Sequence, residues 1–216
     1  MAINPSIEKT ADGSDTLRHP VTGDTYHSLR GALGEALHVF IEKGVAAVVK
    51  SELSVLEIGF GSGLNAWLTL EYAGRLGITV QYTGVELYPV STDAVRRLNY
   101  TDNPLYMALH ECPWEMPVQI TRCFTLTKMA ADFAAMGFNS TFDIVYFDAF
   151  APDTQPELWT VEIFSKLYCA INPGGILVTY SAKGSVKRAL RAAGFEVERL
   201  PGALGKRHML RAIKKI

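Results

Sequence analysis

From residue 54 onward, short apolar runs alternate with longer segments that carry apolar residues at helical spacing. Short apolar runs of this kind are typical of buried strands. They predict seven strands, at residues 54–60, 80–86, 124–129, 142–148, 175–180, 195–200 and 208–214. The segments between them predict helices, among them a basic helix at 184–193. Strands that alternate with helices favour a parallel sheet with helices on both faces.

The last two predicted strands are joined by residues 201–206 alone. That loop is too short for the crossover of a parallel pair, so this pair should be antiparallel. The pattern predicts an α/β fold: a doubly wound, Rossmann-like, seven-stranded sheet with an antiparallel last strand. Its ligand should lie at the carboxyl ends of the first, second and fourth strands. Residues 100–123 contain three prolines and are expected to form an irregular surface excursion.

The first 45 residues precede this alternation. Residues 16–24 include Pro20 and Gly23 and indicate a short hairpin or turn. Apolar positions at helical spacing then predict a helix that covers one side of the site, at Leu33, Leu37, Phe40 and Ile41. We expect a single domain over residues 1–216, in which residues 1–45 form an N-terminal extension.

Composition narrows the class of protein. The chain has 216 residues, of which 48% are hydrophobic, as one globular domain requires. No stretch is long and apolar enough for a membrane span, and the N-terminus does not resemble a secretory signal. Cys112, Cys123 and Cys169 are scattered and have no metal-ligand spacing, so we expect reduced thiols, no metal and a cytoplasmic location. Nothing in the sequence indicates the oligomeric state.

A glycine-rich stretch, Glu57–Asn65 (EIGFGSGLN), joins the first predicted strand to a helix. Glycines let a ligand approach the backbone closely, and the amides at a helix start favour electron-rich groups. Dinucleotide sites use the different rhythm G-x-G-x-x-G. The rhythm E-x-G-x-G-x-G resembles the first motif of S-adenosylmethionine (SAM) methyltransferases. The alternative is a strand–helix turn that needs glycines only for its geometry.

The resemblance implies SAM as the cofactor and assigns a set of binding residues. From the glycine-rich stretch these are Gly59, Phe60, Gly61, Gly63 and Asn65, with Glu57 expected to organise the loop by accepting backbone amides.

Two further acids follow predicted strands. Glu86 ends the second strand, where a carboxylate can accept both ribose hydroxyls; the alternative is an exposed strand-end acid. Asp132, just after the third strand, is expected to accept from the adenine amine, while Phe133 packs on the ring. Asp132 is equally suited to cap a helix that begins at residue 133.

Asp148 follows the fourth predicted strand. In amine-methylating members of this fold, the segment after that strand presents a polar group to the nucleophile, so Asp148 is the candidate catalytic residue. The alternative is a carboxylate that caps the next helix.

From about residue 16 to its end, the chain resembles one family in particular, the methyltransferase domain of the bacterial tRNA 5-methylaminomethyl-2-thiouridine biosynthesis proteins (MnmC) and its stand-alone relatives. The stretches that carry this resemblance are LEIGFGSGLN at 56–65, FDAFAP at 147–152 with PELWT at 156–160, NPGG at 172–175 continuing to TYSAKG at 179–184, and GKRHML at 205–210. The pairing of FDAFAP with PELWT is more specific than the glycine motif.

The family implies that the methyl group of SAM is transferred to the exocyclic amine of 5-aminomethyl-2-thiouridine at the tRNA wobble position. The sequence contains no fingerprint for the flavin of the two-domain form. We therefore expect the amine to come from another enzyme or pathway.

Two groups of residues are expected to bind the tRNA substrate. Tyr26, Phe150 and Tyr180 would shape the nucleoside pocket, although aromatic residues near strand ends are more often part of the core. Residues 181–216 hold ten Lys and Arg against two Glu, a net charge of +8, whereas the rest of the chain carries eleven basic and twenty acidic residues. The candidate phosphate contacts are Lys183, Lys187, Arg188, Arg191, Lys206 and Arg207; the alternative is a solvated helix with a basic tail.

Other functions remain open. The chain can be a SAM-dependent methyltransferase of a small-molecule amine or of a protein, or a non-catalytic SAM- or RNA-binding protein. The complete glycine motif together with Glu86 and Asp148 argues against a non-catalytic protein. A nicotinamide dehydrogenase is disfavoured by the glycine rhythm.

Overall fold

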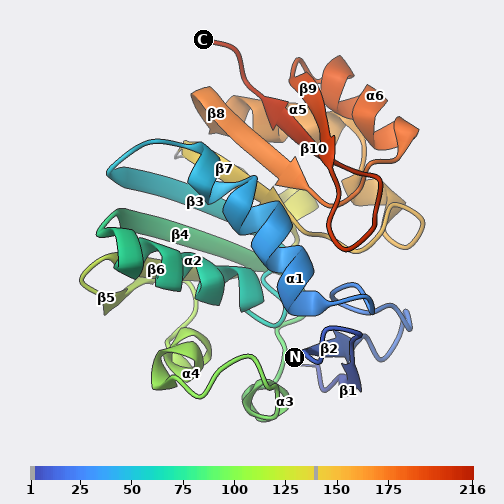
Figure 1. The fold of residues 1–216 in the computed structure, drawn as a ribbon. Helices are drawn as coiled ribbons and strands as arrows, with labels where there is room; N and C mark the ends of the chain where they lie inside the picture. Colours follow the sequence, from blue (N-terminus) through green and yellow to red (C-terminus); the bar gives the residue numbers. More distant parts are fainter. Residues whose placement is uncertain (1–2, 139–140) are drawn as a thin grey trace.

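The computed structural model describes residues 3–138 and 141–216, and an eight-stranded sheet forms its centre (Figure 1). The strand order is β5-β6-β4-β3-β7-β8-β10-β9. Five neighbouring strands are parallel: β6 (Phe124–Ala130), β4 (Thr79–Glu86), β3 (Glu52–Ile58), β7 (Phe142–Phe147) and β8 (Ile171–Thr179). The last strand, β10 (His208–Ile213), runs antiparallel to both β8 and β9 (Glu196–Pro201). The predicted doubly wound sheet with a reversed last strand is confirmed.

The prediction of an irregular excursion at 100–123 was wrong. This segment contains α4 (Pro104–Glu111) and β5 (Pro117–Thr121), which pairs antiparallel with β6 and adds an eighth strand at the sheet edge. Asn103 caps α4 by accepting a hydrogen bond from Leu105 N, and Pro104 occupies the first turn, where its missing N–H costs nothing. Pro117 starts an edge strand, where proline is also tolerated.

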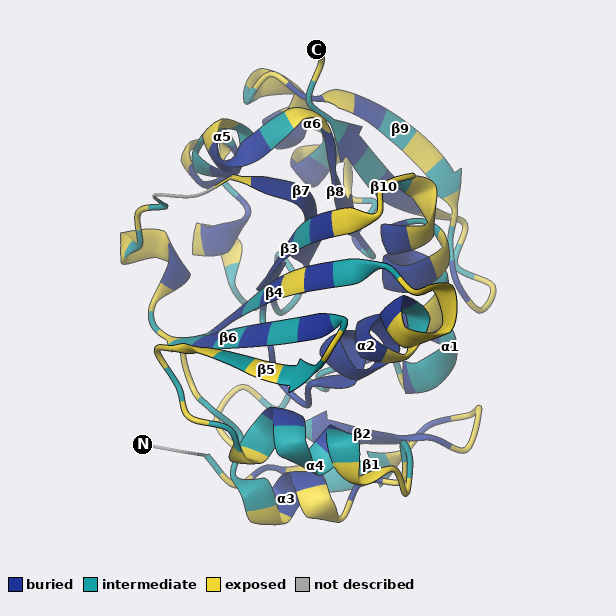
Figure 2. Cartoon of the chain, turned by 90° about the vertical axis from the view of Figure 1, so that its left-hand side faces the viewer, coloured by how far each residue is buried: buried dark blue, intermediate teal, exposed yellow. Residues whose placement is uncertain are grey.

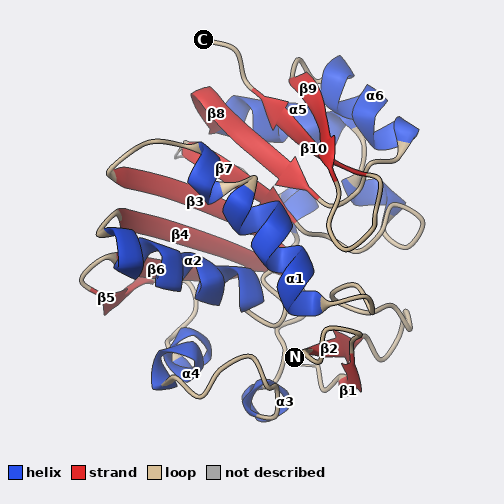
Figure 3. Cartoon of the chain, in the orientation of Figure 1, coloured by secondary structure: helices blue, strands red, loops and turns tan. Residues whose placement is uncertain are grey.

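Helices cover both faces of the sheet (Figure 3). α2 (Leu64–Leu76) and α1 (Ala32–Ala36), which continues as a π-helical segment at Leu37–Glu42, pack on one face. α5 (Val161–Ala170) and α6 (Gly184–Ala192) pack on the other. The helices expected near residues 33–41 and 184–193 are thereby confirmed. Within the described ranges, no helix has the length and apolar character that a membrane span requires.

The central strands are buried on both faces because helices cover both faces of the sheet (Figure 2). Successive side chains of one strand point to opposite sides, so they enter two different cores. Val55 of β3 and Tyr146 of β7 belong to the core beneath α1 and α2. Their neighbours Leu56 and Val145 belong to the core beneath α5 and α6. Packing in two hydrophobic layers therefore holds the sheet in place. The residues at the ends of its strands lie outside these layers and are available for binding or catalysis.

A separate hairpin, β1 (Ser6–Lys9) and β2 (Asp15–Arg18), precedes the main fold. Asp15 and Asn99, which follows α3 (Thr92–Arg96), exchange two hydrogen bonds, Asp15 N to Asn99 Oδ1 at 2.7 Å and Asn99 N to Asp15 Oδ2 at 2.9 Å. This anchor holds the hairpin beside α3, near the carboxyl ends of the parallel strands.

At the opposite end of the sheet, the buried side chain of Asp143 joins three segments. Its Oδ1 accepts from Lys50 Nζ at 2.6 Å and from Asn172 Nδ2 at 2.9 Å, and its Oδ2 accepts from Ser54 N at 3.0 Å. Burial raises the pKa of Asp143, but these hydrogen bonds outweigh that effect and hold the pKa below its ordinary value.

Replacing Asp143 tests this anchor without touching the strand ends where the ligand is expected. Asp143→Ala should lower the free energy of unfolding by about 2–4 kcal/mol, because three buried or half-buried donors lose a charged acceptor. Denaturant unfolding at pH 7 measures the change. Because the folded-state pKa is lowered, the stabilisation is present above the ordinary pKa and is lost as the pH falls through the folded value. The difference between wild type and Asp143→Asn should therefore shrink below about pH 4; a difference that is independent of pH would contradict this assignment.

Candidate active site

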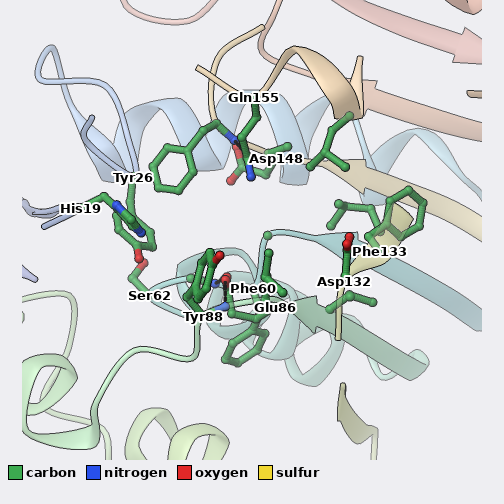
Figure 4. Close-up of a pocket in the computed structure, with 18 of the residues that line it drawn as sticks. His19, Tyr26, Phe60, Ser62, Glu86, Tyr88, Asp132, Phe133, Asp148 and Gln155 are labelled. Carbon is green, nitrogen blue, oxygen red and sulfur yellow. Dashed lines mark hydrogen bonds between the residues drawn. The ribbon is translucent and has the colours of Figure 1, made fainter. Parts of the chain in front are cut away.

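A cavity opens at the carboxyl ends of β3, β4, β6 and β7, where the strand order reverses (Figure 4). Four strand-end segments line it: residues 58–62, 85–88, 131–134 and 148–150. Side chains from the N-terminal segment and from the loop after β7 close its sides: His19, Tyr26, His27, Gln155, Glu157 and Leu158. The cavity lies where the predicted topology places a ligand.

The glycine-rich turn has a geometry that requires its three glycines. Gly59, Gly61 and Gly63 have φ values of 91°, 49° and 70°, in the left-handed region. A Cβ at Gly59 would lie 2.5 Å from the Asp148 carbonyl oxygen, and one at Gly61 would lie 2.8 Å from the Tyr26 ring. The backbone geometry of the turn therefore requires glycine at these positions, as the alternative to a cofactor role proposed. Gly59 and Gly61 also line the cavity.

The tip of this turn is held by polar side chains that sequence reasoning missed. The carbonyl oxygen of Ser62 accepts from Tyr106 Oη at 2.7 Å and from His110 Nε2 at 3.1 Å, both on α4. The Ser62 hydroxyl lies 3.1 Å from His27 Nε2. Burial lowers the pKa of His110 to about 3 and that of His27 to about 4, so both rings are neutral at pH 7. They are fixed hydrogen-bonding groups of the turn.

Glu57 does not organise the turn in the expected way. Its carboxyl group accepts from Asn65 Nδ2 and from Tyr82 Oη, each at 2.8 Å, and no hydrogen bond from a backbone amide to this side chain occurs in the part of the chain that the structure describes. Glu57 is fully buried, and its side chain lies behind the cavity wall. Burial, and secondarily the Asp148 charge, raises the pKa of Glu57 well above its ordinary value. Its effect on the site passes through Asn65.

Asn65 connects Glu57 to the candidate catalytic residue. Its Nδ2 also donates to Asp148 Oδ2 at 2.8 Å, and both Asn65 and Asp148 line the cavity. Burial raises the pKa of Asp148 to about 8, although the Asn65 hydrogen bond favours the ionised form. A carboxyl group with this pKa can change its protonation state near neutral pH and can accept a hydrogen bond from a cationic donor.

The other predicted cofactor residues also meet in the cavity. Glu86 Oε2 accepts from Gly61 N and Oε1 accepts from Tyr88 N, each at 2.9 Å, which leaves one further acceptor position on each oxygen. Burial outweighs these two bonds and raises the pKa of Glu86. Asp132 caps the short helix Phe133–Ala135 through Ala134 N at 2.9 Å, as the alternative reading required, and it lines the cavity as well.

The lining fits a nucleoside cofactor. Two strand-end carboxyl groups, Glu86 and Asp132, offer acceptors for hydroxyl and amine protons, and Phe133 together with Leu87 and Leu158 offers apolar surface for a flat ring. These acceptors and this apolar surface thus match SAM, in which a ribose and an adenine accompany the reactive sulfonium group.

The predicted substrate residues separate into two sets. Tyr26 and Phe150 line the cavity and pack edge to face, with ring centroids 5.1 Å apart. Tyr180 lies outside the lining and donates to the Ala149 carbonyl oxygen at 2.9 Å. Lys183 and Lys206 also lie outside it, paired with Asp153 and with the buried Glu35, and Arg207 is exposed.

Comparison with known proteins agrees with this site. A family model described as S-adenosyl-L-methionine-dependent methyltransferase matches residues 118–215. The tRNA 5-methylaminomethyl-2-thiouridine biosynthesis bifunctional protein MnmC of Pseudomonas fluorescens (strain Pf0-1) is 30% identical over 97% of this chain and 35% of its own length. MnmC of Ectopseudomonas mendocina is 33% identical over 87% of this chain and 32% of its own. The crystal structure of MnmC2 from Aquifex aeolicus superposes with a TM-score of 0.78 at 26% identity, over 98% of this chain and 70% of that one.

The fold, the cavity and these matches indicate a class: the chain is similar to SAM-dependent methyltransferases in sequence over residues 118–215 and in fold over 98% of its length. Within that class it corresponds to the methyltransferase part of the MnmC proteins, and it spans about a third of the length of these curated relatives. The predicted fold, family resemblance and cofactor are therefore confirmed, while the roles of individual site residues stay predictions.

Glu86 provides a direct test of the cofactor site. Glu86→Ala should weaken SAM binding about 10- to 100-fold, because the ligand and the Gly61 amide both lose an acceptor. Calorimetric titration with SAM measures the affinity, and Glu71→Ala, on the exposed face of α2, is the matched control. Equal affinity of the Glu86 variant and the wild type would exclude Glu86 from the site.

Proposed function

We propose that this protein transfers a methyl group from SAM to the primary amine of 5-aminomethyl-2-thiouridine at the wobble position of tRNA. The observation that carries the proposal is the half-buried carboxyl group of Asp148, held by Asn65 beside the glycine-rich turn and lining the cavity. The relatives named for 5-methylaminomethyl-2-thiouridine biosynthesis supply the substrate class. The proposal makes tRNA the macromolecular partner and places the activity in the cytoplasm.

Bound SAM supplies an electrophilic methyl group on a positively charged sulfur. The acceptor must present a lone pair, whereas a primary alkylamine resembles lysine, with a pKa near 10.4, and is almost entirely protonated at pH 7. Ionised Asp148 accepts a hydrogen bond from the ammonium group and orients its nitrogen. An adjacent cation lowers the pKa of Asp148 from its value of about 8. One ammonium proton would then pass to solvent, which frees the nitrogen lone pair, while a remaining N–H group keeps its hydrogen bond to the Asp148 carboxylate. As the N–C bond forms and the bond from the methyl carbon to sulfur breaks, the carboxylate would stabilise the positive charge that develops on nitrogen.

Mass analysis of nucleosides tests the proposal. Transfer RNA that carries 5-aminomethyl-2-thiouridine is incubated with the protein and SAM, digested and analysed. A gain of one methyl group on that nucleoside is the expected result. If no methyl is gained while SAM still binds in a control titration, the tRNA assignment fails. Small-molecule amines and proteins then become the candidate substrates, and absence of transfer to any of them favours a non-catalytic protein.

Asp148→Asn separates catalysis from cofactor binding. The variant should lower kcat for methyl transfer about 100-fold or more, because it loses the ionisable acceptor, while SAM affinity stays within about threefold of wild type. Wild-type kcat/KM should rise with pH through a midpoint near 8, because this parameter reports the carboxyl group of the free enzyme and its ionised form is the active one. Asp102→Asn, an exposed change, is the control. A parallel loss of SAM affinity and turnover would assign Asp148 a structural role.

We infer that the exposed basic face of α6 contacts the tRNA phosphates. Lys187, Arg188 and Arg191 have no ion-pair partner among the residues that the structure describes. The positive charge of Arg191 lowers the pKa of Lys187, as expected where like charges gather. Lys183 and Lys206 already have acidic partners, so a phosphate would have to compete with those partners.

The dependence of tRNA affinity on salt checks this surface. The triple variant Lys187→Ala/Arg188→Ala/Arg191→Ala should reduce the slope of log affinity against log salt by about 2–3, because each lost phosphate contact removes somewhat less than one released counterion. SAM affinity should be unchanged. A flat salt response of the wild type would leave α6 a solvated helix.

A further inference from the structure

His19 lies at the mouth of the cavity, directly after β2, and no motif in the sequence singles it out (Figure 4). Its side chain is only 6% exposed. The ring packs against three aromatic residues, with centroid distances of 5.4 Å to Phe150, 6.1 Å to Tyr88 and 6.3 Å to Tyr26. Phe150 is two residues from Asp148, so this aromatic cluster adjoins the candidate catalytic carboxyl group.

The hydrogen bonds of His19 fix its tautomer. Its Nδ1 accepts from the backbone amides of Val21 at 3.3 Å and Thr22 at 3.1 Å. A ring nitrogen that accepts carries no proton, so the neutral ring bears its hydrogen on Nε2. Burial lowers the pKa of His19, and this effect outweighs the nearby charge of Asp24. The ring is therefore a neutral, single-proton donor at pH 7.

The Nε2–H group makes no hydrogen bond to any residue between 3 and 138 or between 141 and 216. A nearly buried donor on the wall of a cavity favours binding of a ligand that supplies the missing acceptor, because the new hydrogen bond lowers the free energy of the complex. Tyr26 and Phe150 line the same cavity with their rings packed edge to face, and an aromatic lining suits a planar heterocycle.

We propose that His19 is a specificity-determining residue whose Nε2–H donates to a ring carbonyl oxygen of the substrate base. This inference rests on the proposed function, since it takes the substrate to be a uracil-type base with an aminomethyl group at C5. In such a base the C4 carbonyl adjoins C5, so one acceptor lies beside the reacting arm. A cytosine-type base presents an amino group at C4, and two donors would then face each other. His19 thus selects uridine derivatives over cytidine derivatives.

Two substitutions separate this role from the structural role of the ring. In His19→Asn the amide oxygen can replace Nδ1 as the acceptor for the turn amides, but the Nε2–H is lost. In His19→Gln the amide N–H reaches toward the position of Nε2, but the turn acceptor is lost. Methyl transfer to tRNA carrying 5-aminomethyl-2-thiouridine, SAM affinity and thermal unfolding are measured for both variants and for the wild type.

We expect His19→Asn to keep SAM affinity within about threefold of wild type and a Tm no lower than that of His19→Gln, while kcat/KM for tRNA falls about 10- to 100-fold, mostly through KM. His19→Gln should recover kcat/KM to within about threefold of wild type despite a lower Tm. Full activity of His19→Asn overturns the inference, as does a loss of activity in both variants that follows their Tm. These results are distinct from failure of the proposed function, in which the wild type itself binds SAM but does not methylate the tRNA, and in that case the inference falls too.

Discussion

The active site depends on one side-chain amide. Asn65 Nδ2 donates to Glu57 at the end of β3 and to Asp148 at the end of β7, and Tyr82 of β4 holds the other oxygen of Glu57. This chain of hydrogen bonds reaches across three adjacent parallel strands, β4, β3 and β7, and the start of α2. Both carboxyl groups lie where burial disfavours their charged forms, so loss of the amide would leave two acceptors without a donor in a poorly solvated region. The position of the Asp148 carboxyl group is therefore coupled through Asn65 to that of Glu57.

The strands of the sheet could be predicted because the sequence of each short segment indicates its secondary structure. The parallel strands are short segments in which apolar residues recur, and the short loop before β10 dictates an antiparallel pair. The edge region was not predictable in the same way, since proline breaks most regular structure but is tolerated in the first turn of a helix and at the start of an edge strand. Pro104 occupies the first of these positions and Pro117 the second. Whether Pro117 ends regular structure or begins a strand depends on pairing with β6, which lies further along the chain.

The same distinction applies to the site. Strand-end acids such as Glu86 and Asp148 converge because topology brings the carboxyl ends of parallel strands together, so their place in the cavity followed from their place in the sequence. The hydrogen-bond and ion-pair partners in and around the site could not be predicted in this way. Lys206 pairs with Glu35, 171 positions away, and the turn of Gly59–Gly63 is held by His110 from a helix that the pattern did not predict. Such contacts are set by packing between distant segments, which a local pattern does not encode.

The residues suited to the cofactor and those suited to the acceptor come from different parts of the chain. Residues suited to the cofactor come from the sheet ends, whose geometry is fixed by two hydrophobic layers. Those suited to the acceptor come in part from the N-terminal segment, which Asp15 anchors to Asn99 and His27 ties to Ser62 of the glycine-rich turn. The segment also packs against the main fold, through the fully buried Leu17 and through the His19 ring against Phe150. The residues suited to the methyl donor therefore come from the fold itself, and those suited to the acceptor come in part from the segment that precedes it.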